Sequence, residues 1–275
     1  MLVYLLFTTA ALIIALLIIT PIWRLHRRRK QAAKPFPESW HQLLEQRWRL
    51  YSRLPDQVRD HLQQQLLVMM AETEFYGCND LVVTEEMRVL VLAQASLLYG
   101  NIIHDHEVDF PCVLLYPDAF VREGAVQDEL GLVAEERHIL LGESWEQGKV
   151  ILSWADIERN LAQVDSHHNL VIHEYAHQVD GFDGVMNGTP PLAGRAEFTT
   201  WPRVMQSAYD DLCQRIDDGD ESFDAYATTN PAEFFAVVSE YFFIQPRRLN
   251  EDYPDVYRLL AAFYRREPLA WHRDE

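Results

Sequence analysis

The 275-residue sequence has few cysteines and no repetitive segments. Its three cysteines, Cys78, Cys112 and Cys213, are odd in number and form no CxxC pair. This pattern excludes the disulfide framework of small secreted domains and also a cysteine zinc site. Internal repeats and low-complexity segments are lacking as well. We therefore expect free thiols in a reducing compartment and one sizeable globular domain with its own hydrophobic core.

Basic residues are also scarce. Lys and Arg number 24 against 42 Asp and Glu, which gives a formal net charge of -18. Residues 1–30 contain five basic residues and no acidic one, so the remainder of the chain carries a net charge of -23. Such a surface repels a phosphate backbone. The composition therefore argues against direct nucleic-acid binding.

Charge is absent from residues 1–23, which are dominated by Leu, Ile, Val, Ala and Phe. At about 1.5 Å per residue, this run can span a hydrocarbon core of about 30 Å. A cleaved signal peptide is the alternative, but the run has no charged start, is too long and precedes no A-x-A site. Four arginines and Lys30 follow within residues 24–30, and such a basic flank stays in the cytoplasm. We expect a single-pass anchor in the inner membrane with a cytoplasmic domain.

The chain divides into a membrane anchor at 1–23, a basic juxtamembrane linker at 24–37 and a folded domain at 38–275. Apolar spacings of three and four predict mostly helical structure at 40–71, broken around Pro55, and another helix from Thr84 that stops at Gly100. The next part has short apolar runs typical of strands, and helices return from Asp156 onward. The predicted strands are Val113–Tyr116, Arg137–Leu141 and Val150–Trp154.

The segment 170–180 contains the motif His173-Glu174-Tyr175-Ala176-His177. Positions four apart share one face of a helix, so His173 and His177 can bind one cation, with Glu174 beside the open coordination position. Two imidazoles plus a carboxylate suit Zn²⁺ with water as the fourth ligand, and Glu174 would deprotonate that water for attack on a peptide carbonyl. Ser166 can cap the helix and Gly181 can end it. The alternative is a surface helix with unrelated histidines.

A third ligand has to come from elsewhere, and Glu233 is the candidate. Asn230 is a good N-cap and Pro231 fits the first helical position, which places Glu233 in the first turn. Spacing alone leaves open whether Glu233 is a ligand or a capping-box residue that reaches back to its own helix start. Glu240, seven residues on and on the same face, can orient a ligating histidine from behind or simply face solvent.

Asp180, three residues after His177, competes with Glu233 as a ligand by proximity. We favour a role behind the ligands, in which Asp180 ends the helix or shapes the loop 180–184. The remaining histidines of the domain have no ligand-like partner in the sequence, and surface or hydrogen-bonded core positions are expected for them. They include His104, His106, His138, His167 and His168.

Several separated segments resemble the Mlc titration factor A family of bacterial zinc metallopeptidases. The resemblance covers nearly everything from about residue 40 to 270. The matching segments are Phe75–Cys78, Glu85–Val89, Tyr116–Phe120, Val150–Trp154, Asn169–Asp180, Asn187–Gly188 and Pro231–Phe243.

This family is similar to the catalytic domain of anthrax lethal factor. The resemblance implies that Glu233 is the third zinc ligand and that Tyr226, seven residues before it, donates a hydrogen bond to the oxyanion. It implies an α+β fold: a mostly helical, zincin-like metallopeptidase domain with a small mixed sheet, here preceded by one transmembrane helix.

Two functions follow from the resemblance. The first is a zinc-dependent peptidase, aminopeptidase-like in its substrates, in which the strand at 150–154 can bind an extended peptide. The second is a regulatory protein that sequesters a transcription repressor, Mlc in the family, with the zinc site ancillary. An intact Glu174 favours the peptidase, because a pure binding protein has no chemical use for that base. The predicted anchor departs from the soluble members of the family.

Overall fold

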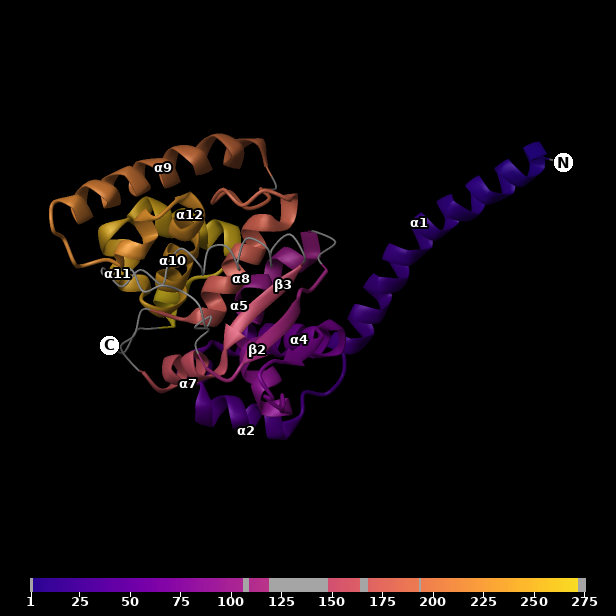
Figure 1. Cartoon of the computed structure of the whole chain (residues 1–275), viewed down its shortest axis with the longest axis horizontal. Helices are drawn as coiled ribbons and strands as arrows, with labels where there is room; N and C mark the ends of the chain where they lie inside the picture. The colour runs from indigo at the N-terminus through magenta and orange to yellow at the C-terminus, as the bar shows by residue number, and fades with distance from the viewer. Residues whose placement is uncertain (1, 106–108, 119–147, 164–167, 193, 272–275) are drawn as a thin grey trace.

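The computed structural model describes residues 2–105, 109–118, 148–163, 168–192 and 194–271. Helices dominate, and Figure 1 shows one long N-terminal helix that projects from a domain of packed helices and a small sheet. Three 3-10 helices span Gly181–Asp183 (η1), Ala225–Thr228 (η2) and Pro268–Ala270 (η3). The α-helices span Leu2–Ala32 (α1), Glu38–Arg47 (α2), Arg49–Arg53 (α3), Asp56–Glu72 (α4), Glu85–Asp105 (α5), Trp154–Ala162 (α7), Leu170–Asp180 (α8), Arg195–Asp217 (α9), Pro231–Ile244 (α10), Pro246–Asp252 (α11) and Pro254–Tyr264 (α12).

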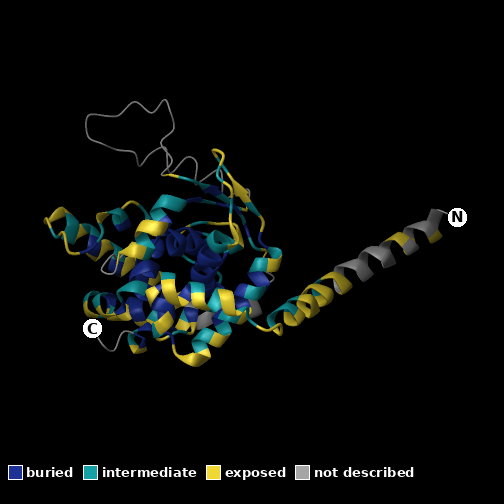
Figure 2. Ribbon diagram, turned by 90° about the horizontal axis from the view of Figure 1, so that it is seen from below, coloured by how far each residue is buried: buried dark blue, intermediate teal, exposed yellow. Residues whose placement is uncertain are grey.

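Helix α1 includes the basic cluster and packs its C-terminal part against α4. Arg28 pairs with Glu72 of α4 at 2.8 Å, and Arg24 pairs with Asp109 at 2.6 Å. The N-terminal part extends away from the domain (Figures 1 and 2). In the part of the chain that the structure describes, no helix combines the length and apolar character needed to cross a membrane. The anchor at residues 1–23 stays a prediction from the sequence.

The predicted helical region at 40–71 is confirmed, with breaks at both Trp48 and Pro55. The helix expected from Thr84 is α5, and the Thr84 hydroxyl accepts a hydrogen bond from the Met87 amide at 3.2 Å. Its predicted end at Gly100 is wrong, because the helix continues to Asp105. A single glycine inside a helix costs only about 1 kcal/mol relative to alanine, which the packing of a buried helix readily offsets.

The sheet contains three described strands in the order β1-β2-β3, which are Phe75–Gly77, Cys112–Tyr116 and Lys149–Ser153. Both pairings are parallel, so the prediction of a mixed sheet is wrong for these strands. The physical reason is the connection: α5 crosses over between β1 and β2, and such a crossover returns the chain in the same direction. The strand predicted at Arg137–Leu141 lies outside the described residues.

The core centres on α8, which packs against both α5 and α10, and Figure 2 shows buried helices at the centre of the domain. Helix α10 is buried from Ala232 to Phe243. Helix α8 is buried at ten of its eleven residues and also contacts β3. Both helices that carry the predicted ligands are therefore fixed by packing on nearly all sides, which holds their side chains in defined positions.

Candidate metal centre

Local sequence sets where α8 begins and ends. Asn169 is the N-cap, and its side-chain oxygen accepts a hydrogen bond from the Ile172 amide at 3.0 Å. The expectation that Ser166 caps this helix is wrong, since the residue next to the first helical position already does so; Ser166 itself lies outside the described residues. Gly181 follows the last residue of α8, as expected, and begins η1 with an ordinary negative φ of -78°.

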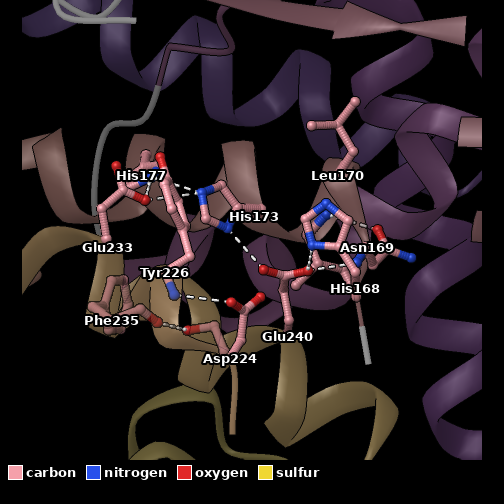
Figure 3. A network of polar contacts seen from close by, with 12 residues as sticks. His168, Asn169, Leu170, His173, His177, Asp224, Tyr226, Glu233, Phe235 and Glu240 are labelled. Carbon is pink, nitrogen blue, oxygen red and sulfur yellow. Dashed lines mark hydrogen bonds and ion pairs between the residues drawn. The ribbon is translucent and has the colours of Figure 1, made fainter. Parts of the chain in front are cut away.

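The start of α10 settles which residue caps it. The Asn230 side chain accepts hydrogen bonds from the amides of Ala232 and Glu233, at 2.9 and 3.0 Å, and Pro231 occupies the first turn. Asn230 thus satisfies the exposed amides of the helix start. The Glu233 carboxylate faces the two histidines of α8 instead (Figure 3).

Three side chains meet in a nearly equilateral triangle of donor atoms. His173 Nε2 lies 3.1 Å from His177 Nε2 and 3.1 Å from Glu233 Oε2, and His177 Nε2 lies 3.2 Å from the same oxygen. A tetrahedral zinc ion with ligands at about 2.0–2.2 Å sets them about 3.3–3.6 Å apart. The observed triangle is within a few tenths of an ångström of that spacing. These residues form an HxxxH-plus-Glu metal site, and all three are buried.

Glu240 supports the triangle from behind. Its Oε1 accepts a hydrogen bond from His173 Nδ1 at 2.7 Å, and its Oε2 accepts from the backbone amide of Asn169 (Figure 3). A carboxylate only accepts hydrogen bonds, so Nδ1 of His173 carries the proton. In the neutral imidazole, the lone pair then lies on Nε2, which is the atom directed at Glu233 and His177.

The pKa shifts of the three side chains in the triangle fit a site that binds a cation. Burial would lower the pKa of His173, but hydrogen bonds with Glu233 and Glu240 overcome this and raise it to about 10. Burial would raise the pKa of Glu233, but its contacts with His173 and His177 hold it well below the usual value. Burial lowers the pKa of His177. A positive charge on His173 is thus favoured by both neighbouring carboxylates, and it offsets part of their negative charge.

Glu174 and Tyr226 lie beside this triangle. Glu174 follows His173 directly on α8, is 2 % exposed, and its charge contributes to the raised pKa of His173. Tyr226 belongs to η2, whose N-cap Asp224 accepts a hydrogen bond from the Tyr226 amide at 2.9 Å. Its ring centroid lies 5.9 Å from that of His173, and Figure 3 shows its side chain extending toward the three ligand side chains.

Asp180 is not part of the ligand cluster. Its Oδ2 accepts a hydrogen bond from the Gly188 amide at 2.8 Å, and burial raises the pKa of this carboxyl to about 7. Gly188 has φ +76°, and its carbonyl accepts from the Trp201 indole at 2.9 Å. A Cβ at Gly188 would lie 2.3 Å from the carbonyl oxygen of Pro231. Asp180 therefore holds a loop that passes tightly over the start of α10.

Two residues that support Glu240 and the start of α8, His168 and Asn169, were not predicted from the sequence. His168 Nδ1 lies 3.0 Å from Glu240 Oε2. The side-chain amide of Asn169 donates to Gln94 of α5 at 2.7 Å, which ties the start of α8 to the central helix. In the sequence, the one feature that points to His168 and Asn169 is their position directly before α8, the helix that carries the HExxH motif.

Comparison with known proteins identifies the family. The family model described as glucose-regulated metallo-peptidase M90 matches residues 22–265. The chain belongs to this family. It is 35% identical over 251 residues to an uncharacterized protein of Synechocystis, covering 90% of this chain and 91% of the relative. Proteins named Mlc titration factor A from Yersinia pestis and Yersinia pseudotuberculosis are 44% identical over 163 residues, which cover 58% of this chain and 59% of each relative.

The predicted family is thereby confirmed, and so is its class, because the M90 family is one of metallopeptidases and the chain carries a matching HxxxH-plus-Glu cluster. The identity of the metal, the substrate and the roles of individual side chains go beyond this finding.

Proposed function

We propose that the chain is a zinc-dependent peptidase that hydrolyses peptide bonds, with aminopeptidase-like substrates. The observation that carries the proposal is the triangle of His173 Nε2, His177 Nε2 and Glu233 Oε2 with 3.1–3.2 Å sides. Two imidazole nitrogens and one carboxylate oxygen are a ligand set typical of catalytic zinc, which keeps its fourth position open.

When bound, zinc acidifies a water molecule and polarises the carbonyl of the scissile bond. The residues of the chain supply the remaining parts. Glu174 accepts the proton of the attacking water and passes it to the leaving amine, and its position directly after His173 on α8 places it beside the ligands. Tyr226 donates a hydrogen bond to the oxygen that gains negative charge. Glu240 holds His173 in the tautomer that presents Nε2.

We further propose that an extended peptide lies along β3. The Cys112 amide donates to Gly148 O at 3.1 Å, so the backbone of Gly148 faces β2, as does that of every second residue after it. The backbone groups of Ile151 therefore face the other edge, where the described residues supply no neighbouring strand. Gln178, next to His177, donates to Lys149 O at 3.4 Å and links this edge to α8. Ile151→Pro removes a backbone donor from this edge, so it should raise the KM for a peptide substrate without removing metal. An unchanged KM would exclude this edge as the peptide-binding site.

The direct test uses the purified full-length protein. Metal analysis should find about one zinc per chain, a chelator should abolish cleavage of small peptide substrates, and added zinc should restore it. Absence of bound zinc together with chelator-resistant cleavage would contradict the proposal.

The second candidate function is sequestration of a transcription repressor. It is favoured by the 44% identity to proteins named Mlc titration factor A, although the alignment spans 59% of their length. Glu174→Gln separates the two functions. If repressor binding is the main function, the variant should bind an Mlc-type repressor as the unaltered protein does while its peptidase activity is lost. Failure of the unaltered protein to bind such a repressor would exclude this candidate.

For location, we propose that α1 anchors the domain to the inner membrane, with the domain in the cytoplasm. The apolar, uncharged residues 1–23 and the basic cluster after them support this, as do the exposed side chains of Phe7, Ile22 and Trp23. A reporter fused to the C-terminus should behave as cytoplasmic, and removal of residues 1–30 should release a soluble, active domain. Activity of a periplasmic reporter would overturn the orientation.

A further inference from the structure

We propose that His168 is a positioning residue of the metal centre, which acts on His173 through Glu240. The inference rests on the proposed function and extends the site by one side chain. The ring centroid of His168 lies 6.3 Å from that of His173, and His168 Nδ1 contacts the carboxylate of Glu240. Figure 3 shows His168, Glu240 and His173 in a continuous chain of contacts.

The two carboxylate oxygens of Glu240 contact different residues. Oε1 holds His173 Nδ1 at 2.7 Å, whereas Oε2 receives His168 Nδ1 at 3.0 Å and the backbone amide of Asn169. The terminal torsion of a glutamate side chain is soft, so the side chain itself does not fix the plane of its carboxylate. The donors on Oε2 fix that plane instead, and they thereby set the direction in which Oε1 meets His173.

His168 is the adjustable member of this pair of donors. The Asn169 amide belongs to the backbone, and its position is fixed because Asn169 caps α8 and binds Gln94. His168 reaches Glu240 with a side chain that is 44% exposed, whereas Glu240 is 2% exposed. The exposed part of the ring buries little apolar surface, so His168 acts on the site mainly through the hydrogen bond from its Nδ1 to this carboxylate.

The predicted consequence is a change in metal binding without a change in folding. Loss of the His168 donor frees the carboxylate to turn, and His173 then presents Nε2 less well to the metal. Partners behind metal-ligating histidines are typically worth about 10–100-fold in metal affinity. Because His168 stands one contact further out, we expect a loss near the lower end, about tenfold.

Three variants of the full-length protein test this inference. His168→Ala removes the ring, His168→Phe keeps a ring without a donor, and His168→Asn places an amide N–H where Nδ1 was. Zinc affinity is measured by competition with a chromophoric chelator, geometry by the visible absorption of the Co²⁺-loaded protein, and folding by thermal unfolding of the metal-free protein.

We expect His168→Ala and His168→Phe to bind zinc about tenfold more weakly and to shift the cobalt spectrum. His168→Asn should recover most of the affinity. The metal-free Ala and Phe variants should stay folded but unfold at a slightly lower temperature, because the buried Glu240 carboxylate loses a donor in both. Unchanged affinity in His168→Ala, an Asn variant as weak as the Phe variant, or an unchanged cobalt spectrum in the Ala and Phe variants would each overturn the inference. If the unaltered protein binds no zinc, the proposed function fails as well. If it binds zinc and the three His168 variants bind zinc equally well, this inference alone fails.

Discussion

Glu240 Oε1 accepts a hydrogen bond from His173 Nδ1 at 2.7 Å, although the two residues lie 67 positions apart in the chain. The contact joins α10 to α8 and fixes the ring that presents Nε2 to the metal. In Glu240→Gln the amide N–H₂ would meet a donor instead of an acceptor, because His168 and Asn169 both donate to this group. Zinc affinity should fall about 10–100-fold in a competition titration.

The matched control is Glu267→Gln, which alters a carboxylate that pairs with the Tyr257 hydroxyl at 3.2 Å. It should bind zinc as the unaltered protein does. Equal affinity in the Glu240 and Glu267 variants would show that the contact with His173 has no bearing on the metal.

Glu174→Gln should keep zinc and lose most activity, because the amide cannot accept the proton of the attacking water while the ligands stay unchanged. Turnover of a peptide substrate should drop by about 10²–10⁴ at full zinc content. Glu158→Gln, which changes an exposed glutamate of α7, serves as the control and should retain both the zinc and the turnover of the unaltered protein. Near-normal turnover by a pure Glu174→Gln preparation would remove Glu174 from the mechanism.

Gly188 and Gly184 offer a matched pair for the loop over α10. Both have positive φ, +76° and +89°, but a Cβ at Gly184 meets nothing within 4 Å, whereas one at Gly188 would lie 2.3 Å from Pro231 O. Gly184→Ala should therefore lose only the backbone preference, about 1 kcal/mol in the free energy of unfolding. Gly188→Ala should lose about 3 kcal/mol or more, because the loop or α10 must shift. Equal losses in urea unfolding would contradict this contact.

Zinc binding should release a proton, because hydrogen bonds with Glu233 and Glu240 outweigh burial and raise the pKa of His173 to about 10 in the metal-free protein. The proton competes with the metal below that pKa, so the apparent zinc affinity should fall as the pH falls. The expected slope is about tenfold per pH unit between about pH 6 and 9. Chelator competition across this range measures the slope. An affinity independent of pH would show that His173 is already deprotonated.

The sequence predicts the features of this site that depend on residues close to one another in the chain. The start of α10 follows from Asn230 and Pro231, and the ligand spacing on α8 follows from the helical repeat. The relations between helices are harder to foresee. His168 and Glu240 meet only because α8 and α10 pack together, and the sequence around His168 does not indicate which residue it contacts. The direction of the strands depends likewise on the crossover through α5, since short apolar runs look the same in parallel and mixed sheets.

The zinc content of Glu233→Gln tests whether Glu233 is the third ligand of the metal site. The change removes the anionic oxygen, while Asn230 continues to cap α10, so the helix should survive. Asp180→Asn is the matched control, because Asp180 binds the Gly188 amide instead of the cluster. With both proteins dialysed against the same dilute zinc buffer, we expect about one zinc per chain in Asp180→Asn and little in Glu233→Gln. Full zinc in Glu233→Gln, with loss in Asp180→Asn, would contradict this role of Glu233.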